Sequence, residues 1–110
     1  MGKKKLPRKV IREVDNFVRT IQEDNVPVER VLVFGSYAKG KQKKWSDIDV
    51  CIVSPRFQDA FSALQYLWRK LPNDPDSAIE PVGFTARDFE EDNLSPLTYE
   101  IKKHGIQVRV

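Results

Sequence analysis

Cysteine, histidine and long apolar runs are scarce in this chain of 110 residues. There is one cysteine, Cys51, and one histidine, His104. An internal disulfide is therefore impossible, and a zinc site built from several thiolates and imidazoles is excluded. No apolar run approaches the roughly 20 residues that cross a bilayer, and the basic start of the chain lacks the apolar core of a signal peptide. We therefore expect a cytoplasmic protein without a membrane span.

The length and composition predict one domain. Hydrophobic residues make up 40% of the chain, which suffices for a single modest core. The net charge of +3 suits an anionic ligand but does not single out nucleic acid. We assign residues 1–9 to a basic, mobile N-terminus and residues 10–110 to the domain. The basic tip gives only slight support to an RNA partner.

Hydrophobic spacing predicts helices that alternate with strands. Apolar residues recur every three or four positions over 10–21 and again over 57–71, which is typical of amphipathic helices. In the second helix we expect the aromatic side chains to pack in the core. Short apolar runs predict strands, at 30–34, 47–54, 78–84 and 106–110. The alternation indicates the α/β class.

Two further segments carry helix signals. Residues 86–92 predict a short helical turn. Ser95 and Pro96 are a typical helix start, with Ser95 as the N-cap and Pro96 in the first turn. This last helix should end at His104, with Gly105 in a left-handed conformation after it. We therefore interpret the histidine as a helix-end residue and not as a catalytic one.

The segment FGSYAKGKQKKWSDIDVCIVS, residues 34–54, carries most of the chemical signal. Gly35, Gly40 and Lys41 nearly match a phosphate-binding loop of the Walker A type. Position 42 is Gln where that motif needs Ser or Thr, and the next strand follows too soon for the long helix of a Walker loop. We reject the match.

A different geometry explains the glycines. The buried strand runs out at Phe34, the chain turns at Gly35, and residues 36–39 can form a helical turn. Its free N–H groups and the Ser36 hydroxyl would face a phosphate beyond the strand end, and Gly35 allows close approach. Lysines at 39, 41, 43 and 44 add positive charge nearby.

Asp47 and Asp49 should share one face of the following strand, because alternate residues point to the same side. Ile48, Val50 and Ile52 should be buried on the other face. Two carboxylates about 7 Å apart at the edge of an apolar strand repel each other unless a cation compensates. Oxygen ligands without histidine or thiol favour Mg²⁺ or Mn²⁺. A phosphate site beside such a cation predicts phosphoryl or nucleotidyl transfer.

The run GSYAKGKQKKWSDIDVCIV resembles the GSxxxGxxxxxSDxDxxI signature of the DNA polymerase beta-like nucleotidyltransferase superfamily. From about residue 8 to 110 the chain is similar to stand-alone minimal nucleotidyltransferases. The resemblance implies a small mixed β-sheet flanked by helices. It also implies that Gly35 and Ser36 bind the β- and γ-phosphates, that Ser46 lies beside the metal site, and that Lys39 replaces a common arginine as a triphosphate contact.

The same resemblance implies a carboxylate site for two Mg²⁺ ions, with Mn²⁺ as an alternative. Asp47 and Asp49 would bind the ions. The family uses a third carboxylate on a later strand, which also helps to deprotonate the acceptor; our candidate is Glu80, with Asp76 in reserve. Pro81 leaves the register of that strand open, because proline cannot donate to a sheet ladder.

Larger members of the superfamily have further domains that hold the acceptor, and we expect none in these 110 residues. The resemblance implies that a second polypeptide takes that part. Minimal nucleotidyltransferases often act as antitoxins that add AMP, taken from ATP, to a small helical HEPN-type partner. We therefore expect Mg-dependent transfer of an NMP to a protein hydroxyl. One alternative is a catalytically idle module that binds nucleotide or a partner. A further alternative is transfer to RNA or to a small molecule.

Overall fold

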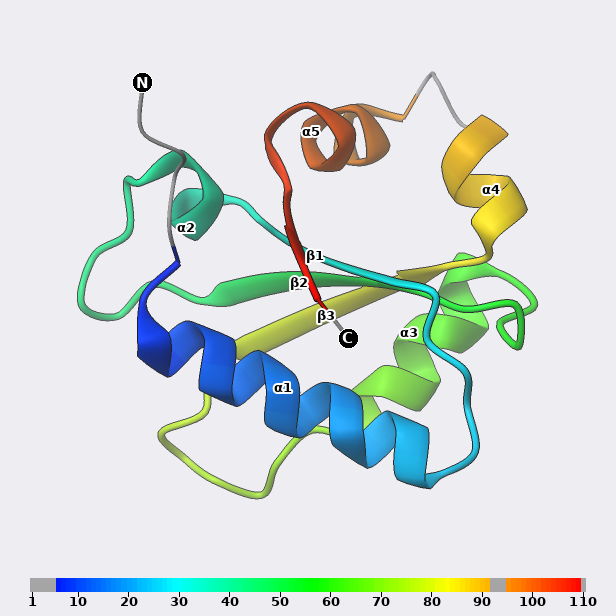
Figure 1. Ribbon diagram of the computed structural model, residues 1–110, viewed down its shortest axis with the longest axis horizontal. Coiled ribbons are helices and arrows are strands. Elements are labelled where there is room, and N and C mark those ends of the chain that lie inside the picture. Colours follow the sequence, from blue (N-terminus) through cyan, green and yellow to red (C-terminus); the bar gives the residue numbers. More distant parts are fainter. Residues whose placement is uncertain (1–5, 92–94, 110) are drawn as a thin grey trace.

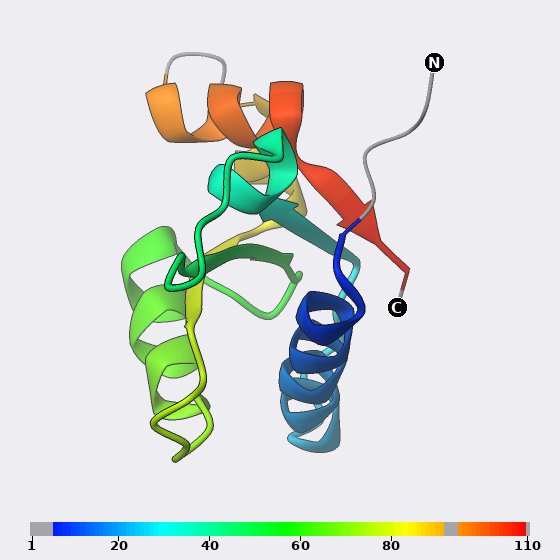
Figure 2. The ribbon, with the colours of Figure 1, turned by 90° about the vertical axis from the view of Figure 1, so that its left-hand side faces the viewer.

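The computed structural model describes residues 6–91 and 95–109. Helices cover both faces of one sheet: α1 and α3 lie on one side, and α4 and α5 on the other (Figures 1 and 2). The basic tip expected at residues 1–9 falls largely on residues 1–5, which lie outside the described part. No helix in the described ranges has the length and apolarity to cross a bilayer. The elements are α1 (Arg8–Glu23), β1 (Arg30–Phe34), α2 (Ser36–Lys39), β2 (Ile48–Val53), α3 (Ala60–Arg69), β3 (Ile79–Phe84), α4 (Ala86–Glu91), α5 (Pro96–His104) and β4 (Ile106–Val108).

The sheet is mixed, with the strand order β3-β2-β1-β4. β1 pairs antiparallel with both β2 and β4, while β2 and β3 run parallel. A parallel pair needs a crossover, and α3 supplies it. This arrangement confirms the expected fold class of a small mixed sheet flanked by helices.

The alternation along β2 divides the core into two layers. Ile48, Val50 and Ile52 are fully or almost fully buried on the face covered by α1 and α3, as predicted. Cys51 and Val53 point to the opposite face, where they pack in the cluster that contains residues of α4 and α5. Asp49 has the same parity as Cys51, so its side chain belongs to this second face.

Pro81 does not interrupt the third strand. The Ile48 N–H donates to the Ala78 carbonyl at 2.7 Å, and the Ser54 N–H donates to the Phe84 carbonyl at 3.0 Å. In a parallel pair this pattern directs the backbone N–H and C=O groups of the even-numbered residues of β3 towards β2. The backbone nitrogen of Pro81 therefore faces the open edge of the sheet. The proline therefore removes no donor from the ladder.

The last helix begins as predicted but ends differently. The Ser95 hydroxyl accepts the Thr98 N–H at 3.4 Å, and Pro96 is the first helical residue. The left-handed conformation expected at Gly105 is wrong, because its φ is −61° and its ψ is 142°. Glycine is needed there for space: a Cβ at position 105 would lie 2.4 Å from the Ile101 carbonyl oxygen.

Helix α3 is shorter than expected and presents another face to the sheet. It begins after Asp59, whose carboxylate accepts the Ser62 N–H at 2.7 Å. Ala63 and Leu67 are buried, whereas Phe61 and Trp68 are 69% and 52% exposed. The prediction that the aromatic residues of this helix pack in the core is therefore wrong for these two. Because the helix lies close to β3, there is room only for a small side chain between them, and Ala63 is the residue that faces the strand.

Candidate active site

Asp49 occupies the point where three strands meet near one end of the sheet. Its Cα partner on β1 is Phe34, the last residue of that strand, and its partner on β3 is Glu80. Side chains of register partners point to the same face, so Asp49 and Glu80 lie side by side. Figure 1 shows β1, β2 and β3 adjacent in the sheet. The structure thus brings together two of the three predicted carboxylates.

The turn after β1 is shaped around the Asp49 carboxylate. Gly35 has a φ of 73°, a region that side-chain-bearing residues rarely adopt. A Cβ at this position would lie 2.1 Å from Oδ2 of Asp49. Both the backbone conformation and the close approach to Asp49 therefore require glycine, while the predicted contact of Gly35 with a phosphate stays a prediction.

The surroundings of Asp49 disfavour its charged form. Burial is the main cause that raises the pKa of Asp49 to about 6. The charge of Glu80, a hydrogen bond to Glu80, and the charge of Asp47 are the smaller causes of the same rise. A hydrogen bond that raises the pKa favours the protonated carboxyl. Like-charged groups are therefore crowded here, and a cation would relieve that crowding.

Asp47 is exposed and immediately precedes β2. Its charge acts on Asp49, yet no group of three acidic, histidine or cysteine side chains in residues 6–91 and 95–109 forms a ready-made metal cage. The available oxygens still suit a hard divalent cation, since Mg²⁺ is usually held by one or two carboxylates together with substrate phosphates and water. The residues present therefore fit such an ion.

The predicted helical turn after Gly35 exists as α2. Ser36 is its first residue and Lys39 its last, and Gly40 ends it with a left-handed φ of 69°. The Lys39 ammonium forms an ion pair with the carboxylate of Glu100 on α5. Glu100 was missed in the sequence, because it lies far along the chain in a helix whose local pattern gives no sign of a contact with α2.

Ser46 closes the loop between α2 and β2. Its hydroxyl accepts the Lys43 N–H at 2.7 Å, and its own N–H donates to the Lys43 carbonyl at 3.1 Å. These bonds fix the last turn before Asp47. The structure therefore places the predicted Ser46 beside the acidic residues, where it holds the backbone of the loop.

Asp76, the reserve candidate for the third carboxylate, lies in the loop before β3. Its N–H donates to Oδ1 of Asp74 at 2.9 Å, and its side chain is exposed. Glu80 lies on the strand, level with Asp49. The strand register thus favours Glu80 over Asp76 as the partner of Asp49.

Comparison with known proteins gives a family match over almost the whole chain. A family model described as nucleotidyltransferase domain matches residues 11–109. A Haemophilus influenzae protein named "Probable protein adenylyltransferase MntA" is 41% identical over 61 residues. That match covers 47% of this chain and 54% of the relative, so the chain spans about half the length of this relative.

Solved structures share the fold. A crystal structure of a "putative nucleotidyltransferase" from Sulfolobus solfataricus has a TM-score of 0.65 at 16% identity, over 90% of this chain and 78% of that one. A crystal structure described as "the toxin-antitoxin with AMP-PNP" has a TM-score of 0.56 at 26% identity, over 84% of this chain and 70% of that one. The first likeness concerns the fold alone.

Proposed function

The chain belongs to the nucleotidyltransferase domain family, and on that basis we propose that it transfers a nucleoside monophosphate, AMP, from a nucleoside triphosphate to an acceptor hydroxyl. One observation carries the proposal: Asp49 lies level with Glu80 and against the Gly35 turn, which puts a carboxylate pair beside a candidate phosphate site. A half-buried carboxyl whose pKa is raised by burial and by neighbouring carboxylates, as that of Asp49 is, is a common mark of a functional site.

The transfer forms one bond and breaks another. The acceptor oxygen attacks the α-phosphorus, the bond from that phosphorus to the oxygen bridging to the β-phosphate breaks, and pyrophosphate leaves. The hydroxyl proton passes to a carboxylate, for which Glu80 is the candidate. Glu80 is exposed and lies on an edge strand, so an acceptor can reach it.

Asp47, Asp49 and Glu80 would hold the divalent cations, two Mg²⁺ ions or Mn²⁺ in their place. A bound cation supplies charge neutralisation for the polyphosphate and for the developing charge at the α-phosphorus. The protein's own contribution is to fix the carboxylates. The β2–β3 register and the Gly35 turn fix Asp49, and the hydrogen bonds of Ser46 hold the loop that leads into Asp47.

At the polyphosphate end, Gly35 and Ser36 would contact the β- and γ-phosphates. Ser36 begins α2, whose first N–H groups have no helical partner by the geometry of any helix. Lys39 would add a cation to the same side of this short helix, because residues three apart lie on one face. Ser46 acts here through the loop that it holds in place.

The acceptor is proposed to be a hydroxyl of a partner protein, a HEPN-type toxin, with this chain as its antitoxin. The support is the name of the Haemophilus influenzae relative and the toxin-antitoxin structure that contains AMP-PNP.

Label transfer tests the proposal. The protein, purified together with its partner, is incubated with Mg²⁺ and ATP labelled at the α-phosphate or at the γ-phosphate. We expect the α-label alone to appear on the partner, and we expect Asp49→Asn to abolish it. Absence of label with the wild type, or equal labelling by Asp49→Asn, would contradict the proposal. Label that nuclease removes would instead indicate an RNA acceptor.

A further inference from the structure

An ion pair connects the candidate phosphate helix to α5. Lys39 ends α2 and pairs through its ammonium with the carboxylate of Glu100. The side chains of Lys39 and Glu100 are 36% and 29% exposed, so water screens this pair less than a fully exposed one. In Figures 1 and 2, α2 and α5 lie next to each other on the same side of the sheet.

Glu100 has Lys39 as its main cationic partner. The hydrogen bond from Lys39 is the first cause that lowers the pKa of Glu100, and the charges of Lys39, His104 and Lys103 add to it. Lys103 is engaged elsewhere, because its ammonium donates to the Tyr99 hydroxyl at 3.1 Å. Glu100 is therefore ionised near neutral pH and carries its negative charge next to Lys39.

This charge lies at the edge of the proposed polyphosphate site. Ser36 and Lys39 are three residues apart on α2 and so share one face. A polyphosphate held at Ser36 would approach the same ammonium that Glu100 already contacts. Two anions, one from the protein and one from the ligand, would then meet at a single cation.

We infer that Glu100 lowers the affinity for nucleoside triphosphate by competing with the polyphosphate for Lys39. This inference rests on the proposed function. To bind Lys39, the polyphosphate must displace the Glu100 carboxylate from the ammonium, and the loss of that ion pair weakens binding. Glu100 thus sets nucleotide affinity from α5, an element outside the signature segment.

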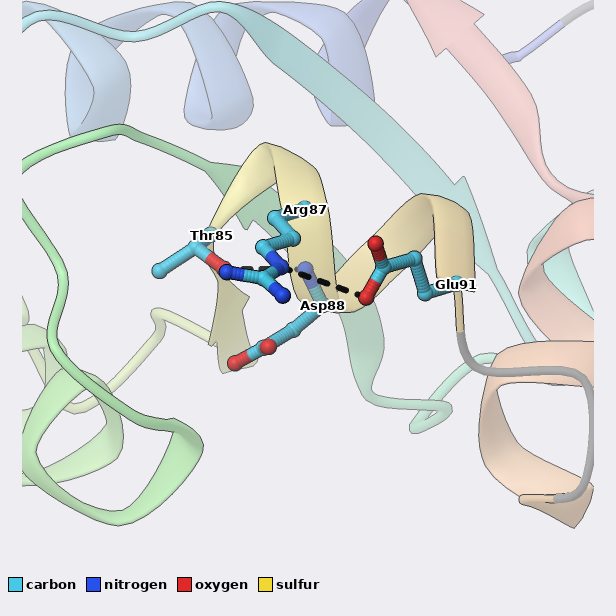
Figure 3. Close-up of polar contacts among 4 residues, drawn as sticks. All are labelled: Thr85, Arg87, Asp88 and Glu91. Carbon is cyan, nitrogen blue, oxygen red and sulfur yellow. Dashed lines mark hydrogen bonds and ion pairs between the residues drawn. The ribbon is translucent and has the colours of Figure 1, made fainter.

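The Arg87–Glu91 ion pair provides a matched control. It lies on α4, where Nε of Arg87 is 3.3 Å from Oε2 of Glu91, and both side chains are largely exposed. Figure 3 shows this pair beside Thr85, whose hydroxyl accepts the Asp88 N–H and caps the helix start. Glu91→Gln therefore removes a carboxylate from an ion pair within α4 that involves neither Lys39 nor Glu100.

Binding of a non-hydrolysable ATP analogue with Mg²⁺, measured by calorimetry, tests the inference without any transfer step. We expect Glu100→Gln to lower the Kd by about three- to tenfold, an effect that shrinks as salt rises. Glu91→Gln should leave the Kd unchanged. An unchanged or raised Kd for Glu100→Gln, with binding by the wild type intact, would overturn the inference while leaving the proposed function standing.

A double variant checks the route through Lys39. In a Lys39→Met background, Glu100→Gln should lower the Kd by less than it does alone, because there is no ammonium left to compete for. An effect of full size in that background would show that Glu100 acts without Lys39 and would overturn the inference. No binding by the wild type would contradict the proposed function, and the inference with it. Thermal unfolding of each variant verifies that it is folded.

Discussion

The Asp49 carboxylate lies directly against the α-carbon of Gly35, with no room between them for a methyl group. The turn that follows β1 and the acidic residue of β2 therefore form one structural unit. The Asp49 carboxylate occupies the space that a side chain at position 35 would fill. Any residue other than glycine at this position would therefore displace the carboxylate. Gly35 is therefore needed to make room for the Asp49 carboxylate, in addition to its proposed contact with a phosphate.

The first prediction concerns Gly35→Ala. The new Cβ would lie 2.1 Å from Oδ2 of Asp49, and the backbone conformation, with φ 73° and ψ −146°, would cost an alanine about 1–3 kcal/mol of strain. We expect a loss of stability of at least that size and a loss of transfer activity of at least about 100-fold, since small misplacements of reacting groups are costly. Denaturant titration and label transfer measure the two effects.

Gly40→Ala is the control for this variant. Gly40 also has a positive φ, 69°, but its ψ of 24° puts it in the left-handed helical region, and a Cβ there would meet no atom within 4 Å. It should show the backbone strain of about 1–2 kcal/mol without the loss of transfer. If both glycine variants lost activity equally, the contact between Gly35 and Asp49 would not be the reason for the glycine at position 35.

The second prediction is that Asp49→Asn stabilises the metal-free protein at neutral pH. Burial and the charge of Glu80 raise the pKa of Asp49 to about 6, so keeping this group ionised above that pH costs folding free energy. After a discount for its partial exposure, the neutral amide should raise the free energy of unfolding by about 1–2 kcal/mol. Denaturant titration in a chelator measures it.

The pH dependence has a definite sign. A carboxyl whose pKa is raised by folding adds stability fully below its unfolded pKa of 3.8 and loses this contribution as pH rises through about 6. The wild type should therefore lose stability relative to Asp49→Asn over that window, and the difference should be constant above it. A wild type that is as stable as the variant at pH 7 would contradict the assigned environment of Asp49.

The third prediction concerns Cys51. Its side chain is fully buried, and burial raises the pKa of the thiol to about 12, an effect that the charge of Arg30 only partly opposes. Because the thiolate is the reactive form, iodoacetamide should not modify the folded protein at mildly alkaline pH. It should modify Cys51 rapidly in guanidinium chloride, as mass spectrometry would show. Rapid modification of the folded chain would contradict this burial.

The local patterns of the sequence predicted the sheet and half of the candidate site. Alternation along β2 correctly separated Ile48, Val50 and Ile52 from the face of Asp49, because side-chain direction in a strand follows directly from the order of residues. The turn at Gly35 followed from the end of an apolar run. Both features depend only on residues that are close together in the chain, so the sequence alone is enough to predict them.

Contacts between distant segments could not be read in the same way. The pairing of Glu80 with Asp49 depends on the register between β2 and β3, which Pro81 left open until the edge position of β3 was known. The ion pair of Lys39 with Glu100 depends on how α5 packs over the sheet. The expected role of Asp47 as a metal ligand stays a prediction, which the label-transfer experiment can address through Asp47→Asn.

The exposure of Phe61 and Trp68 on α3 also results from a contact between segments that are distant in the sequence. Helical spacing favoured a core stripe through Phe61 and Trp68, but close contact with Gly83 of β3 selects the face of Ala63 instead. Periodicity locates an apolar stripe, whereas the space left by the opposite element decides which residues of a broad stripe are buried. A glycine in a neighbouring strand was the signal for this close approach.

The fourth prediction tests that contact with Gly83→Ala. A Cβ at position 83 would lie 2.8 Å from Cβ of Ala63, 2.9 Å from Cε2 of Phe57 and 3.0 Å from Cδ1 of Leu67. Overpacking of this kind costs about 1–3 kcal/mol, and denaturant titration should show a loss of that size. Ala63→Gly alone should cost about 1 kcal/mol, because glycine lowers helix propensity. In the double variant the nearest clash is removed, so the combined loss should be smaller than the sum of the two single losses. Strict additivity would mean that α3 and β3 are not in the close contact that the fold shows.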